Sequence, residues 1–365
     1  MNPLLNEIRR NPLLWLLVFV PMVFIAEHLL SDSPTLLFLL SVLAIVPLAA
    51  LLSHATESVA AKTGDAVGGL LNATLGNLTE LVIALAALRA GEYMLVKASI
   101  AGAIVTNTLF MLGASFLLGG LKHHVQEFNR AGARLQAGQL FLATIALLLP
   151  SAVGAADSVG TAAFTEKLSV SLAILLIAIY GLGLLFSLRT HRDFFGASEP
   201  HGEEEAAPWP MGLALATLGG VTVLVALVSE IFVESVQGAA LALGMSKAFV
   251  GFIVVALVGA AAEMAAAFSG ASKNRMDLSV GIALGSSTQI ALFVAPVLVL
   301  ASYALGPAPM TLQFWPGAVL MVLISTVTAA LVSNSGRSAW FIGVLVLAVY
   351  LTFAITLYLL PPHVP

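Results

Sequence analysis

The stretch LGNLTE at residues 75–80 places a carboxylate, that of Glu80, inside an apolar segment that runs from about residue 68 to 88. A charge near the centre of a bilayer costs about 2.5–3.5 kcal/mol on insertion scales. Such a residue is expected to face a protein interior, a water-filled space or a cation rather than lipid. The stretch therefore indicates a membrane-spanning fold built around a polar site.

The composition supports a membrane protein. Apolar residues make up 59% of the 365 residues and charged residues only 9%, whereas soluble domains carry roughly 25% charged residues. The net charge is −4 and no basic run indicates nucleic acid as a partner. Because cysteine is absent, disulfides, thiol catalysis and cysteine-bound zinc are excluded. The expected partners are membrane lipids and transported ions, with no cofactor and no oligomeric state specified.

Eleven apolar stretches are long enough to cross a hydrocarbon layer of ~30 Å, which takes about 20 helical residues. They lie near 12–30, 34–54, 68–88, 94–119, 134–153, 167–188, 211–235, 247–270, 276–302, 314–333 and 338–360. Lipid cannot hydrogen-bond a bare backbone, and these stretches are longer than barrel strands. The sequence therefore predicts an all-α polytopic membrane protein with about 11 transmembrane helices.

The distribution of basic residues predicts the orientation. With the N-terminus in the cytoplasm, eleven of the fifteen Lys and Arg residues fall in inner loops. These eleven are Arg9, Arg10, Lys62, Lys122, Arg130, Arg134, Arg189, Arg192, Lys273, Arg275 and Arg337. Since inner loops are enriched in Lys and Arg, we expect an integral protein of the bacterial inner (plasma) membrane with a cytoplasmic N-terminus.

The two halves of the chain align at a constant offset of 183 residues. The offset pairs Glu80 with Glu263, and it also pairs the glycines, Gly76 with Gly259 and Gly102 with Gly285. An internal repeat explains this match. The span with Glu80 runs from inside to outside and the span with Glu263 runs the other way, so the repeats are inverted, as in many secondary transporters.

The one long polar segment divides the chain. The predicted organisation is an N-terminal transmembrane helix (1–33), a first five-helix repeat (34–188), an acidic cytoplasmic linker (189–210) and a second five-helix repeat (211–365). The acidic part of the linker, EPHGEEE, fits either a solvated connection or a segment that senses cations.

Polar residues accompany both carboxylates. On a continuous helix, Asn72, Gly76 and Glu80 share one face, with Asn77 and Thr79 close by. Further polar positions at mid-depth are Ser99, Thr106, Asn107, Ser286, Ser287, Thr288 and Gln289. Such residues either surround a ligand or form hydrogen bonds between transmembrane helices. For Ser287 and Gln289 the sequence leaves both interpretations open.

Glu80 and Glu263 are the candidate cation-binding and proton-binding pair. Oxygen donors with two carboxylates suit a hard cation such as Ca²⁺. Two carboxylates in one low-dielectric site repel each other when both are ionised, so at least one keeps a proton unless a divalent cation is bound. Cation and proton then compete for the same groups, which predicts exchange.

A second pair of acids, Glu57 and Glu230, lies in the spans that precede those with Glu80 and Glu263. Each is either a cavity or gate residue or a solvated residue near a helix end. Both interpretations remain open from the sequence.

Three stretches resemble the repeats of the CAX-type calcium/proton exchangers, a branch of the cation/calcium exchanger superfamily. They are HATESVAAKTGDAVGGLLNATLGNLTELVIA (54–84), LVKASIAGAIVTNTLFMLG (95–113) and KNRMDLSVGIALGSSTQIALFVAPVLVL (273–300). The resemblance covers most of residues 50–120 and 210–355. It implies one outlying helix followed by two inverted five-helix repeats joined by an acidic linker.

The resemblance also implies roles for single residues. Glu80 and Glu263 would bind Ca²⁺ or protons, and Asn77 would be a flanking oxygen ligand. Ser287 and Gln289 match polar positions of the second repeat, and Asn107 matches one of the first. Where the family usually has Gly-Asn-Ala-Ala-Glu-His, this chain has GAAAEM at residues 259–264, without the amide and the imidazole.

The leading hypothesis is therefore a Ca²⁺/H⁺ antiporter that works by alternating access. The missing amide at Ala260 keeps a Na⁺(K⁺)/H⁺ antiporter of the same fold as the alternative. An intramembrane enzyme that uses paired carboxylates is less favoured, because no HExxH or nucleophile-elbow motif accompanies them. A channel is less favoured because the paired repeats fit alternating access better.

Overall fold

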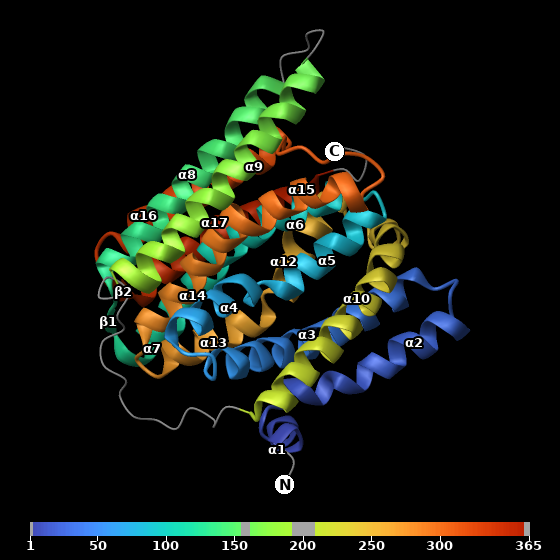
Figure 1. The fold of residues 1–365 in the computed structure, drawn as a ribbon, viewed down its shortest axis with the longest axis horizontal. Helices are drawn as coiled ribbons and strands as arrows, with labels where there is room; N and C mark the ends of the chain where they lie inside the picture. The colour runs from blue at the N-terminus through green and yellow to red at the C-terminus, as the bar shows by residue number, and fades with distance from the viewer. Residues whose placement is uncertain (1–2, 155–160, 192–208, 361–365) are drawn as a thin grey trace.

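A computed structural model describes residues 3–154, 161–191 and 209–360 as a bundle of helices with one small sheet (Figure 1). Within these ranges, nine helices are long and apolar enough to span a membrane, and two further spans are each made of a bent helix pair. The total of up to eleven spans confirms the predicted number, and the all-α fold class is confirmed.

The helices and strands follow each other in two halves. The first half contains α1 (Pro3–Arg10), the 3-10 helix η1 (Pro12–Val18), α2 (Phe19–Leu29), α3 (Pro34–Ala60), α4 (Asp65–Leu75), α5 (Leu78–Arg89), α6 (Tyr93–Val105), the π-helix η2 (Thr106–Met111), α7 (Leu112–His123), β1 (Val125–Glu127), α8 (Arg130–Gly154), α9 (Thr161–Leu185) and the π-helix η3 (Phe186–Thr190). The second half contains α10 (Met211–Ala242), α11 (Lys247–Phe249), the π-helix η5 (Val250–Val255), α12 (Ala256–Gly259), α13 (Ala261–Ser272), α14 (Met276–Gln289), the π-helix η6 (Ile290–Val294), α15 (Ala295–Leu305), α16 (Pro316–Ser333), β2 (Arg337–Ala339) and α17 (Trp340–Leu359).

Two of the predicted spans, 68–88 and 247–270, are broken in the structure. The pair α4 and α5 bends by 41° at Gly76–Asn77, and the pair formed by Lys247–Gly259 and α13 bends by 60° at Ala260. The helices that follow the breaks, α5 and α13, have 12 residues each and start 183 positions apart. The repeat therefore extends to the position of the break.

The predicted limits of two other spans were too short. Helix α3 continues to Ala60 and α10 continues to Ala242, beyond the predicted ends at 54 and 235. Polar residues near each C-terminus ended the apolar pattern early, although the helical backbone goes on. These two helices pack against each other in the lower part of Figure 1.

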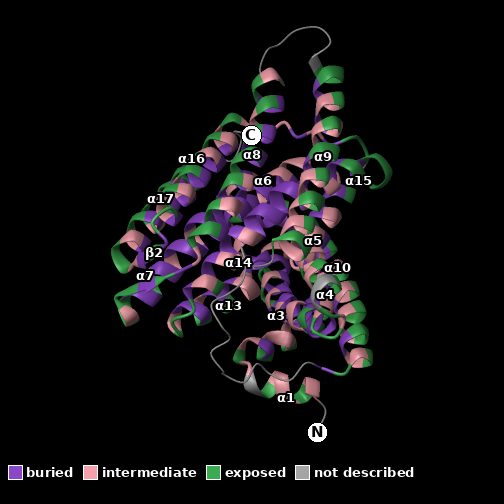
Figure 2. Cartoon of the chain, turned by 60° about the vertical axis from the view of Figure 1, so that its left-hand side comes forward, coloured by how far each residue is buried: buried purple, intermediate pink, exposed green. Residues whose placement is uncertain are grey.

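The most buried span is the one formed by α6, η2 and α7, which runs through the centre of the bundle (Figure 2). Helix α6 touches η5 through small residues. A Cβ on Gly102 would lie 2.1 Å from the carbonyl oxygen of Phe252, and a Cβ on Gly251 would lie 2.5 Å from the Cβ of Ala98. Glycines of this kind let transmembrane helices approach closely.

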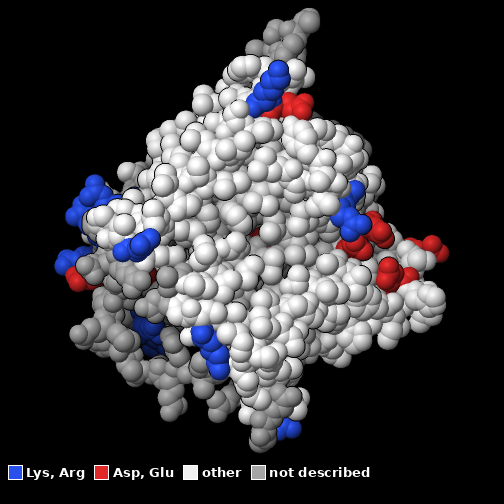
Figure 3. Space-filling view, in the orientation of Figure 1, with Lys and Arg blue, Asp and Glu red and all other residues white. Residues whose placement is uncertain are grey.

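Charged side chains gather at the edges of the molecule and leave an uncharged band between them (Figure 3). At one end of the span Tyr93–His123, Lys247 pairs with Glu92 at 3.0 Å. At the other end, Lys122 Nζ donates to the carbonyl oxygen of Ser272 at 2.8 Å. The uncharged band has the composition expected of a surface in contact with lipid.

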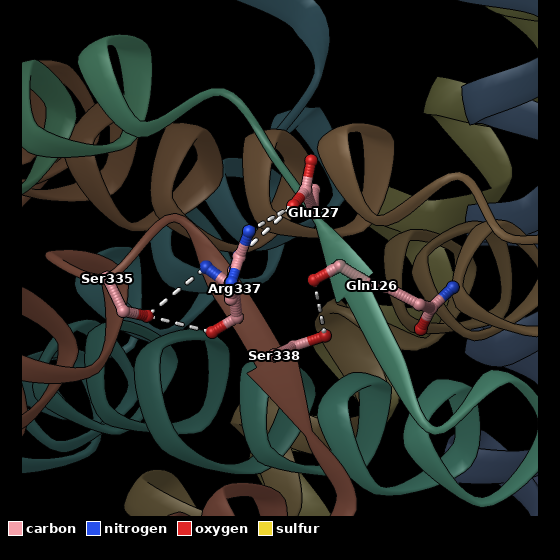
Figure 4. A network of polar contacts seen from close by, with 5 residues as sticks. All are labelled: Gln126, Glu127, Ser335, Arg337 and Ser338. Atoms are coloured by element: carbon pink, nitrogen blue, oxygen red, sulfur yellow. Dashed lines mark hydrogen bonds and ion pairs between the residues drawn. The ribbon is translucent and has the colours of Figure 1, made fainter.

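The small sheet pairs β1 antiparallel with β2 and was not predicted. Arg337 forms an ion pair with Glu127, Ser338 donates to the carbonyl oxygen of Gln126, and Ser335 accepts from the Arg337 backbone (Figure 4). Strands of three residues are too short to show an alternating pattern. The pairing ties a loop of the first half to a loop of the second half.

Candidate cation site

The two helix breaks place the two carboxylates in equivalent positions. Glu80 is the third residue of α5 and Glu263 is the third residue of α13. The N-terminus of a helix carries a partial positive charge that favours an anionic side chain in its first turn. Each break thus creates a helix N-terminus inside the bundle with a carboxylate beside it.

The structure brings Glu80 to the second break, next to the segment that carries Glu263. Glu80 reaches across to the second break, since a Cβ added to Gly259 would lie 2.9 Å from its Cγ and 3.3 Å from its Oε1. A side chain at position 259 would therefore push the first carboxylate away. Two acids that lie 183 residues apart in the sequence therefore belong to one site.

A chain of hydrogen bonds crosses the site beside the carboxylates. Asn107 Nδ2 donates to Ser286 Oγ at 2.9 Å, and Ser286 Oγ donates to Asn77 Oδ1 at 2.7 Å. Asn77 precedes α5, is 1% exposed and makes no side-chain cap to that helix. Ser286 also lies beside the carboxyl group of Glu263. The serine thus connects both repeats.

Gln289 completes the cluster at the first break. Its Oε1 would lie 3.4 Å from a Cβ on Gly76. The side chain is buried at the end of α14, where the π-helix η6 begins. Gly76 therefore leaves room for this amide next to the start of α5.

Several buried polar atoms of the cluster have no hydrogen-bond partner in the described parts of the chain. They are Asn77 Nδ2, Glu80 Oε1, Asn107 Oδ1, Glu263 Oε2 and Gln289 Nε2. An unsatisfied buried polar atom costs about 1–3 kcal/mol, more if it is charged. A flip of the Gln289 side chain would put its amide oxygen in place of Nε2, and Asn77 Oδ1 keeps a second lone pair beside the one that accepts from Ser286. The cluster thus offers five side chains whose oxygens can surround a cation.

The side chains of the cluster offer several neutral oxygen atoms but only two carboxyl groups as ligands for a cation. Within the described ranges, no group of three or more His, Asp or Glu residues is placed to hold a metal ion. A cation here would be held by the two carboxylates with amide and hydroxyl oxygens around them. A hard cation prefers such oxygen ligands.

Two of the predicted site residues lie elsewhere. Ser287 Oγ donates to the carbonyl oxygen of Ala283 in its own helix, at 2.8 Å, so its neighbour Ser286 makes the contacts between repeats. Asn72 is exposed on α4. Its predicted alignment with Glu80 on one helical face is wrong, because the break at Gly76–Asn77 changes the direction of the helix.

The second pair of acids also lies outside the cluster. Glu57 is exposed in the last turn of α3 and accepts from Ser53 Oγ at 3.2 Å. Glu230 pairs with Arg89 at 3.1 Å and joins α10 to the end of α5. Glu230 is thus placed at a contact between helices rather than at the carboxylate centre.

One polar contact near the site was missed from the sequence. The hydroxyl of Tyr180 on α9 donates to the carbonyl oxygen of Ala73 on α4, one turn before the first break. A lone tyrosine in an apolar span gives no signal of such a partner, because the acceptor is a backbone atom 107 residues away.

The profile of the sodium/calcium exchanger protein family matches residues 33–189 and 213–359. The chain belongs to this exchanger family. The two matched segments leave out the first helix and the segment around residues 190–212. The resemblance seen in the sequence is thereby confirmed.

Relatives cover almost the whole chain. A "Ca(2+)/H(+) antiporter" of Aphanothece halophytica is 41% identical over 360 residues, which is 95% of this chain and 96% of the relative. "Ca(2+)/H(+) antiporter ChaA" of Bacillus subtilis is 41% identical over 335 residues, 89% of this chain and 92% of that protein. A solved structure, "native YfkE", has a TM-score of 0.82 at 36% identity and covers 96% of this chain and 100% of the other. An "H+/Ca2+ Exchanger CAX" has a TM-score of 0.72 at 16% identity, covers 95% of this chain and 91% of that one, and supports the fold.

Proposed function

We propose that this protein is a secondary active antiporter that exchanges Ca²⁺ for protons by alternating access. The observation that carries the proposal is the pair Glu80 and Glu263 at the two helix breaks, each with one buried oxygen that lacks a partner. Membership of the exchanger family and relatives named Ca²⁺/H⁺ antiporters support the same activity. Transport, rather than catalysis, is the function of this site.

Competition between ions follows from the charges. With Ca²⁺ bound, both carboxylates are ionised and their mutual repulsion is offset by the cation. When Ca²⁺ leaves, the buried carboxylates regain protons, since two adjacent negative charges in a low-dielectric interior are unfavourable. Ca²⁺ and protons therefore occupy the site in turn, and moving the loaded site from one side to the other exchanges them.

The ligands follow from the hydrogen-bond chain. Glu80 and Glu263 are the charged ligands for Ca²⁺ and the proton carriers. Asn77, Gln289 and Asn107 supply amide oxygens around them, and Ser286 orients Asn77 by donating to it. Ser287 is assigned to helix structure rather than to the ion, since its hydroxyl is bonded within α14.

The arrangement in the membrane extends the sequence prediction. We propose that the N-terminus lies in the cytoplasm of a bacterial cell and that the protein resides in the inner membrane. The ends of α7 and α13, where Lys122 contacts Ser272, then face inside. The end with the Lys247–Glu92 pair faces outside. The boundaries 1–33, 34–188 and 211–365 remain the proposed division, and most of the linker, residues 192–208, lies outside the described residues.

A Na⁺(K⁺)/H⁺ antiporter is the second candidate, and one observation favours it. Ala260 precedes α13 at the position where Asn77 precedes α5, and it has no side-chain oxygen. The second break therefore offers one ligand fewer than the first. A site with fewer oxygens suits a monovalent cation better than Ca²⁺, which takes six to eight oxygen ligands.

Everted membrane vesicles test the function. After a respiratory substrate has acidified the vesicles, added Ca²⁺ should partly dissipate the pH gradient, measured with a fluorescent amine. Glu80→Gln and Glu263→Gln should each abolish this response, because the site then keeps only one carboxylate. The matched control is Glu234→Gln, an exposed residue of α10, which should exchange normally.

Each outcome has a defined meaning. A response to Na⁺ or K⁺ without one to Ca²⁺ would contradict Ca²⁺/H⁺ exchange and support the second candidate, a Na⁺(K⁺)/H⁺ antiporter. Normal exchange by either Glu→Gln variant, in protein that is purified folded, would contradict the two-carboxylate mechanism.

A further inference from the structure

The two half-helices that lead to the site are held very differently. Lys247–Gly259 is buried along most of its length and locked against α6 through Gly251 and Gly102. Its counterpart α4 is exposed at Val67 (51%) and Leu70 (48%), and its polar Asn72 is also exposed. In the proposed orientation, the outer half-helix is buried and the inner one is partly exposed.

Helix α4 is attached to α3 at its start. At the start, Gly64 has φ +80°, a backbone conformation that favours glycine, and a Cβ on Gly68 would lie 2.3 Å from the carbonyl oxygen of Ala60. This end is therefore fixed to α3. The other end stops at the break, where Gly76 N donates to Asn72 O.

Tyr180 holds the free end of α4. Its hydroxyl donates to the carbonyl oxygen of Ala73. This carbonyl directly follows that of Asn72, which accepts from the backbone N–H of Gly76. The ring of Tyr180 stacks on Phe293 of η6, with centroids 5.4 Å apart and planes at 29°. Further back along α4, Gly69 faces Leu188 of η3, since a Cβ there would lie 2.5 Å from Leu188 Cδ2. One side of α4 is thus docked on the span that contains α9 and η3.

We propose that Tyr180 is a positioning residue for exchange. Its hydroxyl holds α4 against α9 in the conformation described here, in which the outer half-helix is buried, and this bond breaks when the site turns to the outer side. A helix break leaves backbone carbonyls that need other donors inside a membrane protein. Tyr180 supplies such a donor in one conformation and thereby favours that conformation. The inference rests on the proposed antiport.

The KM for Ca²⁺ can be measured from the inner side and from the outer side of the membrane. The Tyr180 hydrogen bond should lower the inner KM and raise the outer KM. A net hydrogen bond changes an equilibrium about fivefold, and the apparent affinity from one side depends on the fraction of protein open to that side. Tyr180→Phe keeps the ring on Phe293 but removes the donor. The ratio of inner KM to outer KM should therefore rise about fivefold.

The measurement is ⁴⁵Ca²⁺ transport in everted and right-side-out vesicles of the same preparation. The matched control is Tyr303→Phe, which removes a hydroxyl that donates to Glu166 at the outer end of α15 and should leave the ratio unchanged. A merely structural defect would lower the amount of active protein without changing the ratio. An unchanged ratio in Tyr180→Phe, with exchange intact in wild type and control, overturns the inference while the antiport stands.

A cross-link gives a second test that does not depend on the phenylalanine variant. Because the chain has no cysteine, Gly69→Cys with Leu188→Cys creates a single pair, between residues that face each other. Oxidation should stop exchange but leave ⁴⁵Ca²⁺ binding from the inner side, and reduction should restore exchange. Continued exchange by the oxidised protein would show that exchange does not require α4 to leave this position, and the inference would fail.

Discussion

The two broken spans share one plan but differ in two respects. Both break at the same repeat position and both place a glutamate third in the following helix. The first break carries Asn77 and has an exposed half-helix before it, whereas the second carries Ala260 and has a buried half-helix before it. The difference teaches that a symmetric sequence plan can adopt an asymmetric conformation, which is what alternating access requires.

The asymmetry can be traced to packing at small residues. Gly102 and Gly285 are repeat partners, yet only Gly102 lies against another backbone. A Cβ there would meet Phe252, while a Cβ on Gly285 would meet the flexible end of Gln136 at 3.2 Å. The half-helix Lys247–Gly259 is thus held by direct backbone contact with α6, and Gly285 makes no equivalent backbone contact.

The largest effect is expected from disturbing the contact between Gly102 and the buried half-helix Lys247–Gly259. Gly102→Ala should lower the stability of the purified protein by about 1–3 kcal/mol, because overpacking forces α6 and η5 apart. Gly285→Ala should cost less, since the Gln136 amide can move. Thermal unfolding in detergent measures both variants. Equal losses of stability would mean that the two glycines are packed alike and that the contrast between the half-helices is wrong.

A smaller effect is expected from the polar chain at the first break. Ser286→Ala leaves Asn107 without its acceptor and Asn77 without its donor, at a cost of about 1.5 kcal/mol. The KM for Ca²⁺ should rise about tenfold, as measured by ⁴⁵Ca²⁺ uptake. Ser287→Ala is the matched control and should change KM little, because that hydroxyl is bonded within its own helix. A larger effect at Ser287 than at Ser286 would reverse the assignment.

The smallest effect is expected from the exposed ion pair at the end that we propose faces outside. Arg89→Gln removes the pair with Glu230 that joins α5 to α10. Exposed pairs contribute about 0–1 kcal/mol, so the outer KM should fall by less than about fivefold, and only at low salt. Transport in right-side-out vesicles at two ionic strengths checks this. A large change that is independent of salt would contradict the assignment of this pair as a weak surface contact.

Much of the site could be predicted because it depends on residue type and periodicity. A glutamate in an apolar span and a second one at a constant offset are visible without coordinates, and the structure brings Glu80 and Glu263 together. The choice between Ser286 and Ser287 was not visible, since neighbours on a helix point in different directions and the direction depends on packing. The alignment of Asn72 with Glu80 failed because a single break reorients the chain.

The sequence by itself determined the membrane-spanning class, the number of spans, the inverted repeat and the pair of acids. Each of these follows from the cost of placing polar groups in lipid, which acts locally along the chain. Only the tertiary structure decided which half-helix is buried, which serine joins the repeats, and that the hydroxyl of Tyr180 reaches the carbonyl oxygen of Ala73. These depend on contacts between distant segments, where a backbone atom or the absence of a Cβ is the partner and leaves no pattern in the sequence.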